Sequence, residues 1–143
     1  MIAVDTNILV YAHRAGVPQH EVAVRVLRDL AGGQRPWALP FPCIGQFLRV
    51  VTHGVFRPQP TTMATALHNL DVLIASPMTQ VLLPTERHVS VLRDVLVESG
   101  ALGGDVYDAQ IAALCLEHGV EEILTADRGF RRFSGLKVTD PFR

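Results

Sequence analysis

Short apolar segments alternate with amphipathic segments along this 143-residue sequence, and this alternation is the feature that most constrains the fold. Each apolar run is bounded by Pro, Gly or polar residues, which is typical of short buried strands. The candidate strands are 2–4, 37–39, 80–83, 121–125 and 136–139. Strands separated by helices predict a mostly parallel sheet covered on both faces. We therefore expect an α/β protein with three layers, α/β/α, around a mostly parallel central sheet.

Helical periodicity fills the segments between these runs. The clearest example is the apolar spacing of i, i+3, i+4 and i+7 in residues 20–31, which two glycines follow. The other candidate helices are 7–16, 44–54, 61–76, 84–98 and 106–118. A chain of this length is too short for two domains of ordinary size, so we expect one domain over residues 1–143.

Composition excludes several classes of protein. The sequence is 48% hydrophobic and 19% charged, which is not typical of a disordered chain. Its net charge of -1 gives no overall basic field for nucleic acid. Arg strongly outnumbers Lys, which suits phosphate binding but is equally expected from genome base composition. Cys43 and Cys115 lie in apolar segments without metal-ligand spacing, so we expect reduced, buried thiols and a cytoplasmic protein. The longest uncharged stretches are interrupted by Pro, Gly or polar residues, so we expect no membrane anchor.

Acidic residues stand where the expected strands end. Asp5 follows the first strand, Asp127 follows the strand at 121–125, and Asp105 and Asp108 open the helix before that strand. The carboxyl ends of parallel strands meet at one edge of a sheet, so these acids can converge there. Carboxylates without cationic partners raise one another's pKa and favour a hard divalent cation, Mg²⁺ or Mn²⁺. Such a centre suits hydrolysis of a phosphodiester.

Each acid also has a simpler structural explanation. Taken alone, Asp105 is best explained as a helix N-cap. For Asp108, a first-turn acid that the helix dipole stabilises and a functional carboxylate are equally good explanations. Asp127 could cap the turn that follows it. Asp5 has the weakest alternative, because it has no helix to cap unless one begins directly after it. No His-x-x-x-His or His-Glu-x-x-His pattern is present, which argues against zinc.

Two neutral residues accompany these acids. Asn7 can hold the backbone of the turn after Asp5, orient the Asp5 carboxylate, or do both, and we favour a mixture. Thr125 can orient a metal-bound water or simply belong to its strand.

Four motifs, in order along the chain, resemble a PIN-domain protein of the VapC toxin type. They are "VDTNIL" at 4–9, "FLRVVTH" at 47–53, "YDAQIAALCLEHG" at 107–119 and "LTADRGFRRFSGLKVTDPF" at 124–142. The resemblance implies a magnesium-dependent endoribonuclease toxin, a VapB-type antitoxin that occludes its site, and a homodimer. It also places the family's three acids on Asp5, Asp108 and Asp127, as metal ligands and catalytic residues, and matches Thr125 to the family's Thr or Ser.

One position departs from the family pattern. Gln46 stands where a Glu is usual; it brings no charge and cannot act as a base. Asp105 could replace the missing charge, the site could work with three acids and weaker metal binding, or the protein could bind RNA without efficient cleavage. We favour the second, because Mg²⁺ is commonly held through water and one or two carboxylates.

Substrate and partner contacts can also be predicted. Arg128, Arg131 and Arg132 are candidates for the RNA backbone, although an ordinary solvated face explains them equally well. The segments Val22–Leu30 and Met63–Ile74 could form a groove for an antitoxin helix, although such stripes are more often core. The main rival to the enzyme is a binding-only PIN protein. A dehalogenase-like phosphatase loses ground because Asn7 stands where that class needs a second acid.

Overall fold

The computed structural model describes residues 1–143 and contains one sheet of five parallel strands. The strand order across the sheet is β3-β2-β1-β4-β5, which places β1 at the centre. The strands are β1 (Ile2–Val4), β2 (Trp37–Pro40), β3 (Thr79–Leu82), β4 (Glu122–Leu124) and β5 (Lys137–Thr139). The expected parallel sheet is confirmed.

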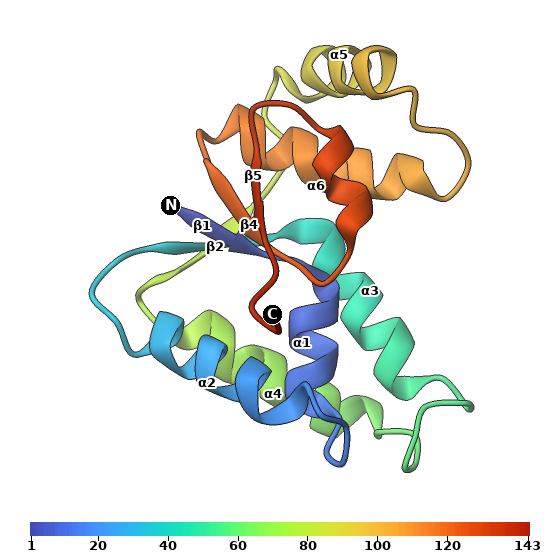
Figure 1. The fold of residues 1–143 in the computed structure, drawn as a ribbon. Helices are drawn as coiled ribbons and strands as arrows, with labels where there is room; N and C mark the ends of the chain where they lie inside the picture. The colour runs from blue at the N-terminus through green and yellow to red at the C-terminus, as the bar shows by residue number, and fades with distance from the viewer.

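Helices cover both faces of this sheet, so the predicted three-layer arrangement is confirmed (Figure 1). The α-helices are α1 (Thr6–His13), α2 (His20–Ala31), α3 (Phe41–Thr52), α4 (Met63–Ala75), α5 (His88–Ser99) and α6 (Asp105–Glu117). A short 3₁₀ helix, η1 (Arg128–Arg132), follows β4. In Figure 1, α1, α2 and α4 lie below the sheet and α5 and α6 above it, while α3 packs against α1, α4 and α6.

The central strands are apolar because neither of their faces reaches water. Trp37, Ala38 and Leu39 in β2 are fully buried, as are Ala3 and Val4 in β1. A contiguous core of 29 buried residues joins the sheet to the helices of both layers. Parallel strands buried on both faces read as continuous apolar runs, which is why these short segments could be recognised in the sequence.

Three element boundaries differ from those expected by three residues or more. Helix α1 ends at His13, before Gly16, and α3 begins at Phe41 because Pro42 fits the first helical turn. Helix α5 begins at His88 rather than at residue 84, and the segment before it is held to α6 by the Thr85 backbone N–H, which donates to the Glu117 carboxylate. The expected Thr cap of α4 is confirmed at Thr62, whose hydroxyl accepts from the backbone N–H of Thr65 at 3.2 Å.

Both cysteines lie in the hydrophobic core. Cys43 and Cys115 are free and fully buried, as expected. Burial raises the pKa of both thiols, that of Cys115 to about 12, so both stay protonated at neutral pH. None of the helices is long and apolar enough to cross a membrane.

Candidate active site

Asp5 lies at the junction of β1 and α1, where it is only 5% exposed. Its backbone N–H donates to the carbonyl of Leu124, which continues the pairing of β1 with β4. One carboxylate oxygen, Oδ1, accepts from the backbone N–H of Thr6 at 2.7 Å, so Asp5 is the N-cap of α1. The helix begins directly after Asp5, and the capping explanation for this acid therefore holds for Oδ1.

The second oxygen of Asp5 faces two neutral side chains. Oδ2 accepts from the Thr125 hydroxyl at 2.7 Å and from the Asn7 amide at 3.1 Å. Asn7 also accepts, through its Oδ1, from the backbone N–H of Ala126 at 3.2 Å. The expectation that Asn7 orients the Asp5 carboxylate is confirmed, whereas the expectation that it holds the turn after Asp5 is wrong, because its Oδ1 accepts from the backbone that follows β4.

Thr125 connects Asp5 to Asp127. The Thr125 side chain is almost fully buried, and its hydroxyl accepts from the backbone N–H of Asp127 at 3.0 Å. Asp127 caps η1, because its Oδ1 accepts from the N–H of Gly129 at 2.7 Å. The predicted capping role of Asp127 is thus confirmed. Its other oxygen has no hydrogen-bond partner in the chain and remains available to a ligand.

The expectation that Asp105 is a helix N-cap is wrong. Gly104 occupies the N-cap position and Asp105 is the first residue of α6. The Asp105 carboxylate instead accepts from the Arg132 guanidinium at 3.0 Å, and the same guanidinium donates to the carbonyl of Gly129. Arg132 therefore ties η1 to α6 and neutralises Asp105, which makes both residues less available for the cation and RNA contacts considered above.

Asp108 lies one turn further along α6 and is half-buried, with no cation or hydrogen-bond donor on its carboxylate. Burial raises its pKa to about 6, the negative charges of Asp5, Asp127 and Asp105 add to the rise, and Arg132 opposes it. Burial likewise raises the pKa of Asp5 against the hydrogen bonds from Thr125 and Thr6. The acids of the two strand ends and of α6 therefore share one electrostatic environment.

This donor set fits a divalent cation that keeps part of its water shell. No three Asp, Glu, His or Cys side chains lie close enough together to enclose an ion by themselves. The acids nevertheless repel one another, and the one guanidinium beside them is already engaged by Asp105. Mg²⁺ retains several waters and needs one or two carboxylates, which is the kind of ligand set available here.

Gln46 and Thr6 complete the polar shell of the site. The Thr6 hydroxyl donates to Gln46 Oε1 at 2.6 Å, so α3 is fastened beside Asp5 through a neutral contact. Thr6 was not among the sequence candidates, although its place between Asp5 and Asn7 in the first motif was a signal. Arg128 and Arg131 are exposed on η1 and form no ion pair.

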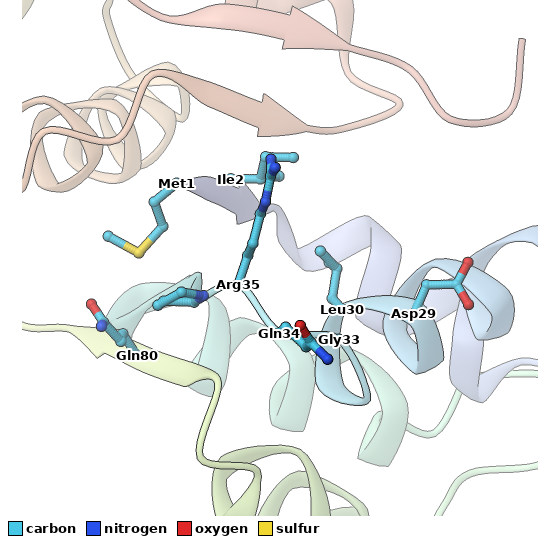
Figure 2. Close-up of a pocket in the computed structure, with 9 residues that line it drawn as sticks. Met1, Ile2, Asp29, Leu30, Gly33, Gln34, Arg35 and Gln80 are labelled. Atoms are coloured by element: carbon cyan, nitrogen blue, oxygen red, sulfur yellow. The ribbon is translucent and has the colours of Figure 1, made fainter.

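The largest of the cavities is elsewhere. Figure 2 shows a cavity of about 660 Å³ near Met1, Ile2 and Gln80, at the edge of the sheet where the strands begin. Its charged residues, Asp29 and Arg35, point apart, and none of the candidate acids reaches it. Two other cavities matter more: one of about 590 Å³ between α3 and α6 that includes Gln46, and an apolar groove of about 330 Å³ among α1, α2 and α4.

Comparison with known proteins identifies relatives over the full chain. The PIN domain family matches residues 2–136. Ribonuclease VapC43 of Mycobacterium tuberculosis is 39% identical over 141 residues, which cover 99% of this chain and 95% of that protein. Ribonuclease VapC33 of the same species is 32% identical over 143 residues, 100% of this chain and 99% of that protein.

Solved structures share the fold at lower sequence identity. VapBC2 from Rickettsia felis, bound to a DNA fragment from its promoter, superimposes with a TM-score of 0.69 at 17% identity, covering 97% of this chain and 98% of that one. VapC20 of Mycobacterium tuberculosis, a toxin that cleaves the sarcin-ricin loop, gives 0.68 at 19% identity, covering 96% and 99%.

Proposed function

Because this chain belongs to the PIN-domain family, within its group of VapC ribonucleases, we propose that it is a metal-dependent endoribonuclease and the toxin of a toxin–antitoxin pair. The observation that carries the proposal is the environment of Asp5 and Asp108. Both carboxylates are withdrawn from water beside other negative charges, and neither has a cationic partner. Such an arrangement costs stability and is typical of a functional site.

We assign the metal to Asp5, Asp108 and Asp127. Asn7 and Thr125 hold the Asp5 carboxylate in one orientation, and Thr125 also fixes the backbone of Asp127. When bound there, Mg²⁺ would polarise the scissile phosphate and lower the pKa of the attacking water. A proton competes with the ion for Asp108, whose pKa is about 6, so metal binding weakens in acid.

Two exposed arginines of η1, Arg128 and Arg131, are placed to contact the RNA backbone beside Asp127. Arginine suits phosphate because its planar guanidinium can donate two parallel hydrogen bonds. Arg132 has a different task, since its pairing with Asp105 holds η1 against α6. We therefore expect Arg128 and Arg131 to position substrate and Arg132 to position the site itself.

The apolar groove among α1, α2 and α4 supports the antitoxin as partner. Leu27, Leu70 and Leu73 line it, and Val72 on its rim is 60% exposed. Both sequence segments predicted to form this groove contribute to it. An amphipathic helix of a VapB-type antitoxin would cover these side chains with its apolar face. The homodimer implied by the family stays a prediction, which sedimentation of the isolated chain would check.

Cleavage of a structured RNA in Mg²⁺ is the direct test of the proposal. Asp5→Asn keeps the size of the side chain and removes its charge, and we expect cleavage to fall at least about 100-fold. Asp29→Asn is the matched control, because Asp29 is an exposed acid on α2 far along the chain from every candidate acid. Equal cleavage by wild type and Asp5→Asn would refute the metal site.

Gln46 favours the binding-only protein as the second candidate, because it lacks the charge that the family usually supplies. Gln46→Glu adds a carboxylate that the Thr6 hydroxyl can still donate to. We expect about tenfold tighter Mg²⁺ binding, by titration calorimetry, with faster cleavage at low Mg²⁺. If wild type is inactive and Gln46→Glu cleaves RNA, the natural protein is a binding protein. If affinity and rate are both unchanged, position 46 has no role at the metal.

A further inference from the structure

We propose that the cavity between α3 and α6 binds one unpaired nucleotide of the RNA beside the scissile phosphate. The base stacks on Tyr107, and the phosphate pairs with Arg49. This inference rests on the proposed ribonuclease function, since it names the subsite that would hold the substrate next to the metal. It assigns a task to the "FLRVVTH" motif, which the metal site leaves unexplained.

Faces of α3 and α6 form two walls of this cavity, and Pro84 and His88 at the start of α5 contribute a third. On α3, Pro42, Gly45, Gln46 and Arg49 follow one another at helical spacing, so they share one face. On α6, the facing residues include Tyr107, three residues before Gln110. The volume of about 590 Å³ lies within the usual range for small-ligand sites and accommodates a nucleotide.

Two residues of the cavity border the candidate active site. Gln46 lines the cavity and also accepts the hydrogen bond of Thr6, the residue after Asp5. Tyr107 lines the cavity and directly precedes Asp108 on α6. If the scissile phosphate of an RNA lies at Asp5 and Asp108, the neighbouring nucleotide of that RNA lies at the mouth of this cavity.

The charge of the cavity is opposite to that of the acids beside it. None of its lining residues is acidic, and Arg49 is exposed and forms no ion pair. The buried acid Glu117 does not line the cavity and is paired with His88, whose Nδ1 lies 2.8 Å from it. The phosphate next to the scissile one therefore lies near the unpaired guanidinium of Arg49. A positive charge at this position favours binding of the negatively charged RNA backbone.

Exposed aromatic rings indicate a base rather than a second phosphate. Tyr107 is 61% exposed and Phe41 is 52% exposed, and both line the cavity. Rings that face water on a protein surface are typical stacking platforms for bases of single-stranded RNA. The amides of Gln46 and Gln110 can both donate to and accept from the edge of a base. A paired base is stacked inside its duplex and cannot enter, so the subsite selects unpaired RNA.

Binding of a short RNA tests the subsite separately from cleavage. The probe is a fluorescein-labelled, unstructured hexaribonucleotide in Mg²⁺, and the protein is the full chain carrying Asp5→Asn, so that the probe stays intact. Adding Tyr107→Ala should weaken binding about tenfold in fluorescence anisotropy, whereas Tyr107→Phe keeps the ring and should stay within about twofold. Arg49→Ala should reduce the slope of log Kd against log salt by about 0.7, the value for one lost phosphate contact with a single strand.

Arg25→Ala is the matched control, because Arg25 is an exposed arginine on α2 and does not line this cavity. It should change neither affinity nor salt slope. Unchanged binding by both Tyr107→Ala and Arg49→Ala, in a protein whose parent cleaves RNA, would overturn the subsite and leave the ribonuclease intact. Loss of binding in these variants, in a protein whose parent does not cleave, would support the subsite and refute the ribonuclease. Dissociation of a dimer by Tyr107→Ala, with unchanged RNA affinity, would make this face a subunit contact and overturn the proposal.

Discussion

Asp5 and Glu117 are both buried carboxylates, and their surroundings shift their pKa values in opposite directions. The Glu117 side chain is fully buried at the end of α6, where it accepts from the backbone N–H of Thr85 and from His88, each at 2.8 Å. Burial alone would raise the pKa of Glu117, but these two hydrogen-bond partners outweigh it and lower that pKa. Asp5 also accepts hydrogen bonds, yet burial and the charge of Asp127 raise its pKa.

The difference separates a structural acid from one that is proposed to be functional. Around Glu117, Arg87 donates to the Glu117 carbonyl at 2.7 Å and His118 contacts the Leu83 carbonyl, so the segment before α5 is fastened to α6. Around Asp5 the nearest charges are other acids, and the one cation beside them, Arg132, pairs with Asp105 rather than with Asp5 or Asp108. A buried acid that the protein itself satisfies contributes to folding, whereas one that it leaves unsatisfied is available to a ligand.

Removing the partner of Glu117 is expected to have the largest effect. His88→Ala leaves a fully buried carboxylate with one backbone donor, and we expect a loss of about 2–3 kcal/mol in the free energy of unfolding by urea. Because the pKa of Glu117 is lowered by folding, the stability linked to it is present above its unfolded pKa of 4.5 and is lost as pH falls through its folded pKa. The destabilisation should therefore shrink in strong acid. His68→Ala, at an exposed position of α4 whose ring makes no hydrogen bond, should leave stability nearly unchanged.

The second prediction concerns the Thr125 hydroxyl, which lies between Asp5 and Asp127. Thr125→Val preserves the shape of this almost fully buried side chain and removes the hydrogen bond to Asp5 and the acceptor for the Asp127 N–H. We expect Mg²⁺ affinity, measured by calorimetry, to fall about tenfold or more, as it does when residues that orient metal ligands are lost. Thr125→Ser keeps the hydroxyl and should retain most of the affinity. Equal losses in the Val and Ser variants would indicate packing rather than orientation.

Replacement of Asp108 should have the smallest effect, and it should increase the free energy of unfolding, whereas His88→Ala decreases it. Its folded pKa of about 6 lies above the unfolded value of 3.8, so its contribution to stability is present below 3.8 and is lost as pH rises through 6. In EDTA at pH 7.5, Asp108→Asn should therefore stabilise the fold, by on the order of 1 kcal/mol after allowance for solvent screening of this half-buried group. The gain should vanish near pH 4, and a destabilised variant at pH 7.5 would contradict the unpaired environment of Asp108.

Features that depend on local sequence pattern were predicted well from the sequence. The boundaries of α2 follow from its apolar spacing and the glycines after it, and Asp5 could be chosen because a strand-end acid needs a special reason. Interactions between distant segments escaped this reasoning. The capping role expected of Asp105 failed because Arg132, 27 residues away, supplies a guanidinium. The hydrogen bond from the Thr85 N–H to the Glu117 carboxylate, 32 residues away, was not predicted either, and Thr85 lies in the segment that was expected to be the start of α5.

The hydrogen bond from Thr125 to Asp5 joins residues that are 120 positions apart, near opposite ends of the chain. During translation, the first aspartate leaves the ribosome long before the threonine that orients it has been added. β4 and Asp127 arrive equally late, and β1 gains its second neighbouring strand only then. An unfinished or truncated polypeptide therefore cannot complete the acidic centre. For a protein proposed to cleave RNA, the acidic centre is therefore assembled only after nearly all of the chain has been made.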